Sequence, residues 1–156
     1  MSSLKDEIRK RGPFDGPQQE VFLNLLRTTD RLQRELDEVL KTAGLSGVQY
    51  NVLRILRGAG PETALPCGEV ADRMITRDPD MTRLLDRLER RGLIARCRGT
   101  SDRRVVEVRI TEQGLALLAQ LDRPLADAHK RQLAHLEHQE LLDLLRLLDK
   151  ARNRTE

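Results

Sequence analysis

The chain has 156 residues, the size of one domain with or without an appended oligomerisation element. Its aromatic fraction of 2% argues against recognition of single strands by base stacking, and its net charge of +3 says little alone. It has no run of about 18 apolar residues and no apolar signal segment at the N-terminus, so we expect a soluble, cytoplasmic protein without a membrane partner.

The first 44 residues divide into an arm and a long helix. Residues 1–17 contain two Gly, two Pro and scattered charges, and we expect a flexible N-terminal arm. An apolar stripe of helical period follows and ends at Gly44, which predicts an N-terminal helix over residues 18–44.

Two shorter helices are expected next. Ser46 and Gln49 form a capping box that begins one of them, and Gly58, Gly60 and Pro61 end it. Pro66 opens another, which is predicted to include four apolar residues: Val70, Ala71, Met74 and Ile75.

A further helix is predicted to begin at the capping pair Asp78-Pro79 and to end before Gly92. At 100° per residue its two sides separate cleanly. The apolar side holds Met81, Leu84, Leu85 and Leu88. The polar side holds Thr82, Arg83, Asp86, Arg87 and Arg90, and Arg77 precedes it. Such amphipathicity is common, but three Arg on one face, beside a basic hairpin, favour contact with DNA.

After Gly92, the spacing of the apolar residues changes from a helical period to an alternation. Val106, Val108 and Ile110 alternate with Glu107 and Arg109, which indicates a half-buried strand. The preceding segment, from Leu93 to Arg98, can pair with it across a turn at residues 99–102. Two short helices followed by a hairpin indicate a winged helix-turn-helix. The second helix of the pair is then the recognition helix, or reading helix, which contacts the bases.

The remaining chain is helical. Thr111 caps a long helix with a kink expected at Pro124, and a final helix covers roughly residues 138–152. We therefore expect a mainly α protein with a small β-hairpin (α+β), with a DNA-binding domain over residues 45–111 and C-terminal dimerisation helices over residues 112–156. The apolar faces of the helices at the two chain ends need partners. A second copy is favoured, although both could fold back on their own subunit.

The positive charge is concentrated in the middle of the chain. Residues 45–111 carry 13 Arg and 9 acidic residues. An exposed helical surface stabilised by ion pairs would mix Lys with Arg, whereas an Arg-only stretch suits phosphate and base contacts, because the guanidinium fork matches both. Double-stranded DNA is therefore the expected partner.

The predicted hairpin tip holds Arg98, Asp102, Arg103 and Arg104. The Asp102 carboxylate could orient one guanidinium for entry into a narrow minor groove. An ordinary Asp turn residue is an equally good interpretation from spacing alone.

The stretch PCGEVADRMITRDPDMTRLLDRLERRGLIARCRGTSDRRVVEVRITEQGLALL resembles the DNA-binding core of the MarR family of bacterial regulators. The helix TRLLDRLERRGLI, the wing DRR and the closing ITEQG match in order and spacing, and LSGVQYNVLRIL fits upstream. The resemblance covers about residues 20–150. It implies a triangular homodimer in which the terminal helices interlock and two winged lobes bind a palindrome.

The resemblance also implies roles for individual residues. Thr82 and Arg83 would read the major groove, and Arg104, braced by Asp102, would enter the minor groove. Members of the family commonly release DNA on binding a small aromatic or phenolic anion, or on thiol oxidation. The ligand-binding residues of this chain cannot be named from its sequence.

The cysteines are expected to be structural, and His129, His135 and His138 have no ligand-like spacing with acids or Cys. Cys67 begins a helix, where a thiolate could form, but packing is the plainer interpretation, and Cys97 is expected to pack beside Leu93 and Ala95. No metal site, cofactor or catalytic group is predicted. A DNA-binding regulator, most simply a repressor, is therefore favoured over a winged-helix dimer that binds a protein partner, a thiol-based redox sensor or an enzyme.

Overall fold

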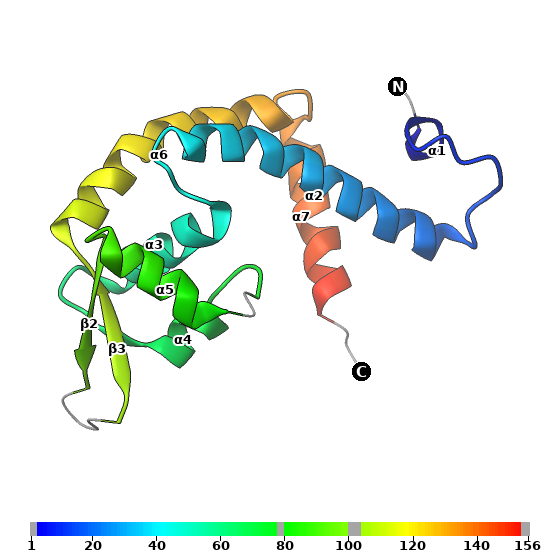
Figure 1. The fold of residues 1–156 in the computed structure, drawn as a ribbon. Helices are drawn as coiled ribbons and strands as arrows, with labels where there is room; N and C mark the ends of the chain where they lie inside the picture. Colours follow the sequence, from blue (N-terminus) through cyan, green and yellow to red (C-terminus); the bar gives the residue numbers. More distant parts are fainter. Residues whose placement is uncertain (1–2, 78–79, 100–103, 154–156) are drawn as a thin grey trace.

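The computed structural model describes residues 3–77, 80–99 and 104–153. A lobe of three short helices and a small sheet lies at one end, and three longer helices extend from it (Figure 1). The lobe helices are α3 (Gly47–Ala59), α4 (Cys67–Asp72) and α5 (Met81–Arg90). The longer helices are α2 (Pro17–Lys41), α6 (Glu112–Leu133) and α7 (His138–Arg152). This arrangement confirms the predicted fold class.

The sheet of the described chain has three antiparallel strands in the order β1-β3-β2. They are β1 (Leu65–Pro66), β2 (Ile94–Arg98) and β3 (Val106–Ile110). In the predicted hairpin, Ile94 pairs with Ile110 and Arg96 with Val108. Strand β1 has two residues, too few for an alternating pattern, and the sequence analysis missed it. Residues 100–102 of the predicted turn lie outside the described part of the chain.

Thr111 and Gly114 fix the start of α6 against the base of the hairpin. The Thr111 hydroxyl accepts from the Gly114 N–H at 3.1 Å and donates to the Gly92 carbonyl at 2.6 Å. A Cβ at position 114 would lie 2.3 Å from the Leu93 carbonyl oxygen, so only glycine allows this approach. The predicted cap is thereby confirmed, and the ITEQG segment joins α6 tightly to the sheet.

Two predicted helix bounds in the lobe are wrong. Helix α4 ends at Asp72, so the expected extension through Met74 and Ile75 is absent, and the Ile75 side chain is 86% exposed. The Ile75 N–H donates instead to the Asn51 side chain, which holds the chain outside the helix. Helix α5 begins at Met81, where Asp80 is the N-cap and accepts from the Arg83 N–H at 3.1 Å. The capping pair predicted at 78 and 79 lies outside the described residues.

The N-terminal segment contains a one-turn helix, α1 (Leu4–Glu7), that the sequence analysis did not predict. Ser3 and Asp6 form a reciprocal capping box, and Leu4 is buried. Glu7 forms an ion pair with Arg27 of α2 at 3.2 Å. The expected arm is therefore attached to α2 over part of its length.

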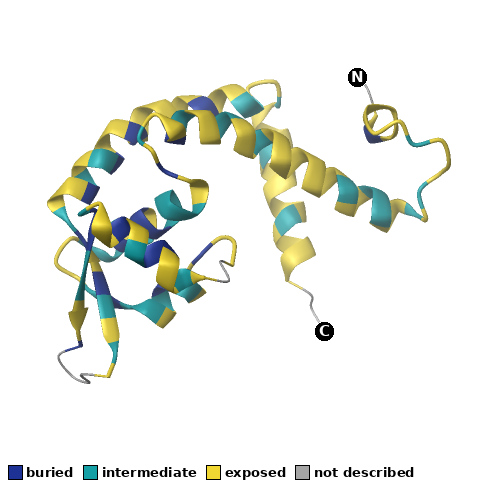
Figure 2. Ribbon diagram, viewed as in Figure 1, coloured by how far each residue is buried: buried dark blue, intermediate teal, exposed yellow. Residues whose placement is uncertain are grey.

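Burial is concentrated in the lobe and along the middle of α6 (Figure 2). Leu53, Leu56, Leu85, Leu88 and Val108 form its centre and are fully buried. By contrast, α7 buries none of its described residues and α2 buries only Leu40. None of the described helices is both long enough and apolar enough to cross a lipid bilayer.

Helix α6 connects the lobe to α2. Near its middle, the Arg57 guanidinium of α3 donates two bonds to the Asp122 carboxylate, at 2.8 and 2.9 Å. Near its end, Arg131 pairs with Glu35 of α2 at 3.0 Å, and Gln132 donates to the Leu32 carbonyl. The helix continues through Pro124 and is visibly curved (Figure 1). The predicted disturbance at Pro124 therefore takes the form of a bend within one helix.

The Arg57–Asp122 pair predicts a pH-dependent stability difference. The hydrogen bonds from Arg57 hold the pKa of Asp122 below its ordinary value, so the carboxylate stabilises the fold above pH about 3.9, its unfolded pKa. This stabilisation is lost as the pH falls toward the lower folded pKa. Because the pair is half exposed, Asp122→Asn should cost about 0.5 kcal/mol at pH 6 and progressively less below pH 4. Urea unfolding of both proteins at pH 6 and pH 3 measures this, and an unchanged difference would contradict it.

Candidate nucleic-acid interface

Helix α5 separates its apolar and polar sides as the sequence predicts. Leu84, Leu85 and Leu88 are buried in the lobe core. The opposite side is exposed and carries Thr82, Arg83, Arg87 and Arg90. These four residues define the outer face of α5.

The N-terminus of α5 is held by one acidic residue. Asp80 accepts from the Arg83 N–H and also forms an ion pair with the Arg83 Nε at 3.1 Å. The Arg83 side chain remains 78% exposed, so it is oriented at the first turn of the helix while its guanidinium reaches solvent. Arg77, which precedes this turn, is also exposed.

The hairpin projects away from the arch formed by α2 and α6, and α5 lies beside its base (Figure 1). Arg98, at the end of β2, and Arg104, just before β3, are exposed on it. Asp102 and Arg103 lie outside the described residues, so the predicted brace between Asp102 and Arg104 stays a prediction. The described geometry places exposed Arg on both α5 and the hairpin.

Arg96 of β2 attaches the hairpin to α5 and was missed by the sequence analysis. Its guanidinium pairs with Asp86 at 2.6 Å and donates to the Thr82 carbonyl at 3.1 Å, and its side chain is 23% exposed. The Arg96 N–H donates to the Glu89 carboxylate at 3.2 Å. The signal in the sequence was the pair of acids at spacing i, i+3 on an otherwise basic helix. The Asp86 carboxylate is thus engaged by Arg96, and its contact with DNA stays a prediction.

The geometry can be compared with known proteins. The sequence profile of the MarR family matches residues 45–106. A crystal structure of a MarR transcription factor from Planctomyces limnophilus is 45% identical in sequence, with a TM-score of 0.67. The match covers 88% of this chain and 98% of that one. This chain belongs to the MarR family.

Two further relatives extend the comparison. The MarR-family "HTH-type transcriptional repressor MdtR" of Bacillus subtilis is 34% identical over 61% of this chain and 59% of its own. The chain therefore spans about three fifths of the length of that curated relative. The structure of a mutant MarR from E. coli complexed with operator DNA is 25% identical, with a TM-score of 0.78 and coverage of 96% and 99% of the two chains. The curated relatives are named as transcriptional regulators, a non-enzymatic role.

The two cysteines of this MarR-family chain differ in environment. Cys67 packs against the core and is partly buried, and this burial raises the pKa of its thiol, although Arg96 acts in the opposite direction. The expected packing of Cys97 is wrong, because its residue is exposed. It lies near the distal end of β2, where the strand extends past the lobe core.

Alkylation tests this difference. In brief iodoacetamide treatment of the folded protein at pH 8, Cys97 should be modified several-fold faster than Cys67, since only the thiolate reacts and burial disfavours it. Peptide mass spectrometry gives both rates, and the unfolded protein serves as the control in which they converge. Faster modification of Cys67 would show that its thiol is activated.

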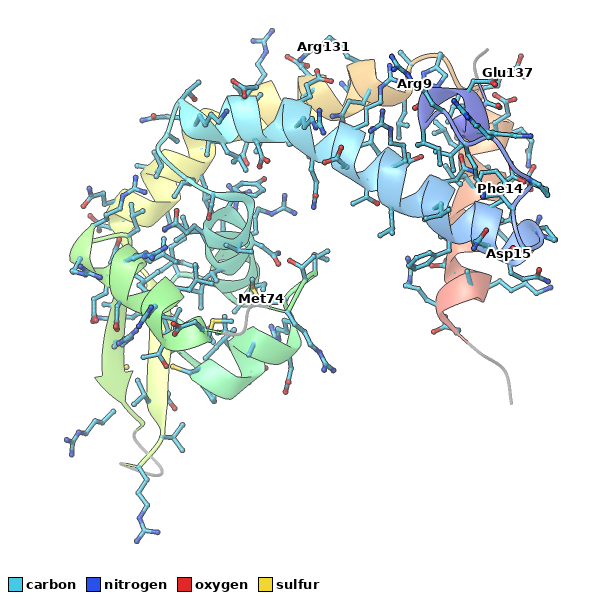
Figure 3. All side chains as sticks on the ribbon, turned by 45° about the vertical axis from the view of Figure 1, so that its right-hand side comes forward. Arg9, Phe14, Asp15, Met74, Arg131 and Glu137 are labelled. Carbon is cyan, nitrogen blue, oxygen red and sulfur yellow. The ribbon has the colours of Figure 1, made fainter. Side chains whose placement is uncertain are left out.

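Two cavities of more than 600 Å³ lie at the end of the described MarR-family chain remote from the lobe. One, of about 660 Å³, lies between α1, α2 and the junction of α6 with α7, and its lining includes Arg31, Arg131 and His135. Figure 3 shows Arg131 at this end of α6. The other, of about 850 Å³, is an apolar groove between α2 and α7. Within the described residues, no group of three or more His, Cys, Asp or Glu could hold a metal ion.

Proposed function

We propose that this MarR-family protein is a transcriptional repressor that binds a palindromic DNA duplex as a homodimer. In this proposal, the outer face of α5 enters the major groove and the hairpin contacts the adjacent minor groove. One observation carries the proposal: the exposed Arg of α5 and the exposed Arg of the hairpin lie on the same lobe, and Arg96 connects the two elements.

The charge pattern supports a duplex as the partner. Arg83, Arg87 and Arg90 project from one helix face, and Arg98 and Arg104 extend the positive surface onto the hairpin. A helix of this kind fits the major groove, whose base edges offer guanine acceptors to Arg. The similar mutant MarR from E. coli was solved with operator DNA.

The unpartnered apolar faces support a dimer. Helix α2 exposes Val21, Phe22, Leu25 and Leu26. Helix α7 exposes Leu142, Leu144, Leu145 and Leu147. The apolar groove between these helices is lined by Val21 and Leu25 of α2 and by Leu144 and Leu145 of α7. A second copy would cover these faces around a two-fold axis, and two lobes related by that axis require a palindromic site.

The repressor role and an effector belong to the same proposal. One relative is named a transcriptional repressor, which favours repression over activation. A small aromatic or phenolic anion is the effector proposed for the cavity lined by Arg31, Arg131 and His135, because arginines there are combined with apolar residues. The lining carboxylates Glu7 and Glu35 are paired with Arg27 and Arg131. A thermal-shift screen of phenolic acids, repeated on Arg31→Ala, tests this part alone.

Selection of bound duplexes from a randomised pool tests the whole proposal. The enriched sequences should form a palindrome with half-site centres about 10 bp apart, and mass photometry should show one dimer per duplex. Enrichment of no duplex sequence would overturn DNA recognition and favour a protein partner. Enrichment of an unpaired half-site by a monomer would overturn the dimer.

Arg83 and Arg104 should differ in the kind of specificity they provide. Arg83 lies in the first turn of α5, so Arg83→Ala should cost about 1–3 kcal/mol and relax the preference at one base per half-site. Arg104 lies on the hairpin, which in this proposal contacts the minor groove. There an Arg senses the width of the groove and the potential of its phosphates, not individual bases. Arg104→Ala should therefore weaken binding most where the flanks are A/T-rich.

The measurement is the affinity of each variant across an operator library with both core and flanks randomised. Asp102→Ala should resemble Arg104→Ala more weakly, since the charge remains. If Arg83→Ala lowers all sites equally while Arg104→Ala changes a core base preference, the assigned roles of helix and hairpin are reversed.

A further inference from the structure

Arg91 lies directly after α5 and points away from the outer face, toward the end of α2. Its Nη1 donates to the Gly44 carbonyl at 2.6 Å, and its Nη2 donates to the Ala43 carbonyl at 2.9 Å. Helix α5 ends at Arg90, so Arg91 is its C-cap residue. The Arg91 guanidinium therefore joins two distant segments of the chain, since Gly44 and Ala43 precede it by 47 and 48 residues.

The two acceptor carbonyls belong to the turn that ends α2. The helix ends at Lys41, and the turn closes where the Leu45 N–H donates to the Leu40 carbonyl. Gly44 has φ +62°, in the left-handed region that glycine adopts without strain. Carbonyls at a helix C-terminus carry partial negative charge, so a guanidinium is a favourable partner for them.

This contact distinguishes Arg91 from the Arg residues on the outer face of α5. Arg83 and Arg90 bond to Asp80 and Asp86 in their own stretch of chain, whereas the Arg91 donors reach carbonyls of a distant segment. Arg96 fixes α5 to the hairpin, inside the lobe. Arg91 fixes the C-terminal end of α5 to the turn that follows α2.

We propose that Arg91 is a positioning residue that sets the distance between the two reading helices of the dimer. The inference rests on the proposed function, because it needs α2 at the dimer interface and α5 in the major groove. With the fork in place, α5 is held at a fixed orientation to the helix that carries the two-fold contact. Without it, each lobe retains its DNA-contacting residues but is less firmly held relative to α2.

A change in spacing tolerance follows, because one base pair adds about 3.4 Å along the duplex. A dimer with rigidly held lobes fits one half-site separation and loses contacts when a base pair is inserted or removed. A dimer with loosely held lobes accepts neighbouring separations. Loss of Arg91 should therefore flatten the dependence of affinity on spacing.

The experiment uses the palindrome selected by the wild type and four derivatives, with one or two base pairs removed from or added to its centre. Affinities are measured for the wild type, Arg91→Ala and Arg91→Lys. The control is Arg123→Ala, which removes an Arg whose side chain is 93% exposed on α6. Thermal melts of all four proteins identify any variant that has lost its fold.

We expect the wild type and Arg123→Ala to bind one spacing about tenfold more tightly than its neighbours. A tenfold loss of affinity corresponds to the loss of about one hydrogen bond to a charged group. Arg91→Ala should reduce this preference to about twofold, and Arg91→Lys, which keeps the charge but not the fork, should fall between them. Equal weakening of both Arg91 variants at every spacing would overturn the positioning role while leaving DNA recognition intact. If the wild type selects no palindrome in the first place, the proposed function is overturned, and the inference with it.

Discussion

Leu145→Asp is expected to convert the protein from dimer to monomer and to abolish tight binding of a palindrome. The Leu145 side chain lines the groove between α2 and α7, and its residue is 59% exposed in the single chain. Burying an unpaired carboxylate costs roughly 2 kcal/mol or more, and a two-fold interface contains the change twice. The dimer should therefore be weakened by about 10³-fold or more.

Sedimentation at micromolar concentration measures the oligomeric state, and titration with full and half palindromes measures the consequence for DNA. Gln139→Asp is the matched control, because it places the same carboxylate on α7 at a residue outside the groove lining. The control should remain a dimer. If Leu145→Asp also remains a dimer, the interface lies elsewhere on the chain.

The second large effect is that of salt. If the dimer contacts six to ten phosphates, its affinity should fall by about 10³–10⁵-fold between 50 and 200 mM salt, because neutralised phosphates release their counterions. The exposed Arg of α5 and of the hairpin supply enough cationic groups in two lobes for that number of contacts.

The slope of log affinity against log salt is the measured quantity. Removing one phosphate contact per lobe by Arg87→Ala should reduce its magnitude by about 1.8, or 0.9 for each of two contacts. Leu145→Asp offers a useful comparison, since a monomer should show about half of the wild-type slope. A flat response to salt would exclude phosphate contacts as the main source of affinity.

Features governed by near neighbours in the chain could be predicted from the sequence. The capping box at Ser46, the Thr111 cap and the strand over Val106–Ile110 each depend on residues within a few positions, and the structure confirms all three. The expected burial of the alternating apolar residues holds for Val108 and Ile110 but is wrong for Val106, which is exposed. The separation of the two sides of α5 follows in the same way from a period of 3.6. The winged fold could be recognised because these local signals occur in one order.

Features that depend on distant partners could not be predicted. The early end of α4 involves the Asn51 side chain on another helix, and Arg96 finds Asp86 only after the hairpin folds onto α5. Arg91 is indistinguishable from Arg90 in the sequence, yet its donors turn inward to Ala43 and Gly44. Cys97 lies two and four residues after Ala95 and Leu93, so the strand period predicts that it packs beside them. It is exposed because β2 extends past the core at this point.

Helix α6 is long and contacts both ends of the structure, so a small tilt of the helix would produce a large displacement at its end. It has 22 residues, so at 1.5 Å per residue its contour is about 33 Å. It is clamped to the hairpin base at Thr111, braced near its middle by Arg57, and tied to α2 at Arg131. A tilt of about 6° at one end would displace the other by about 3.4 Å, the rise of one base pair. If the proposed effector binds in the cavity at the remote end of α6, a tilt of this size would be enough to shift α5 by one base-pair rise along the proposed duplex.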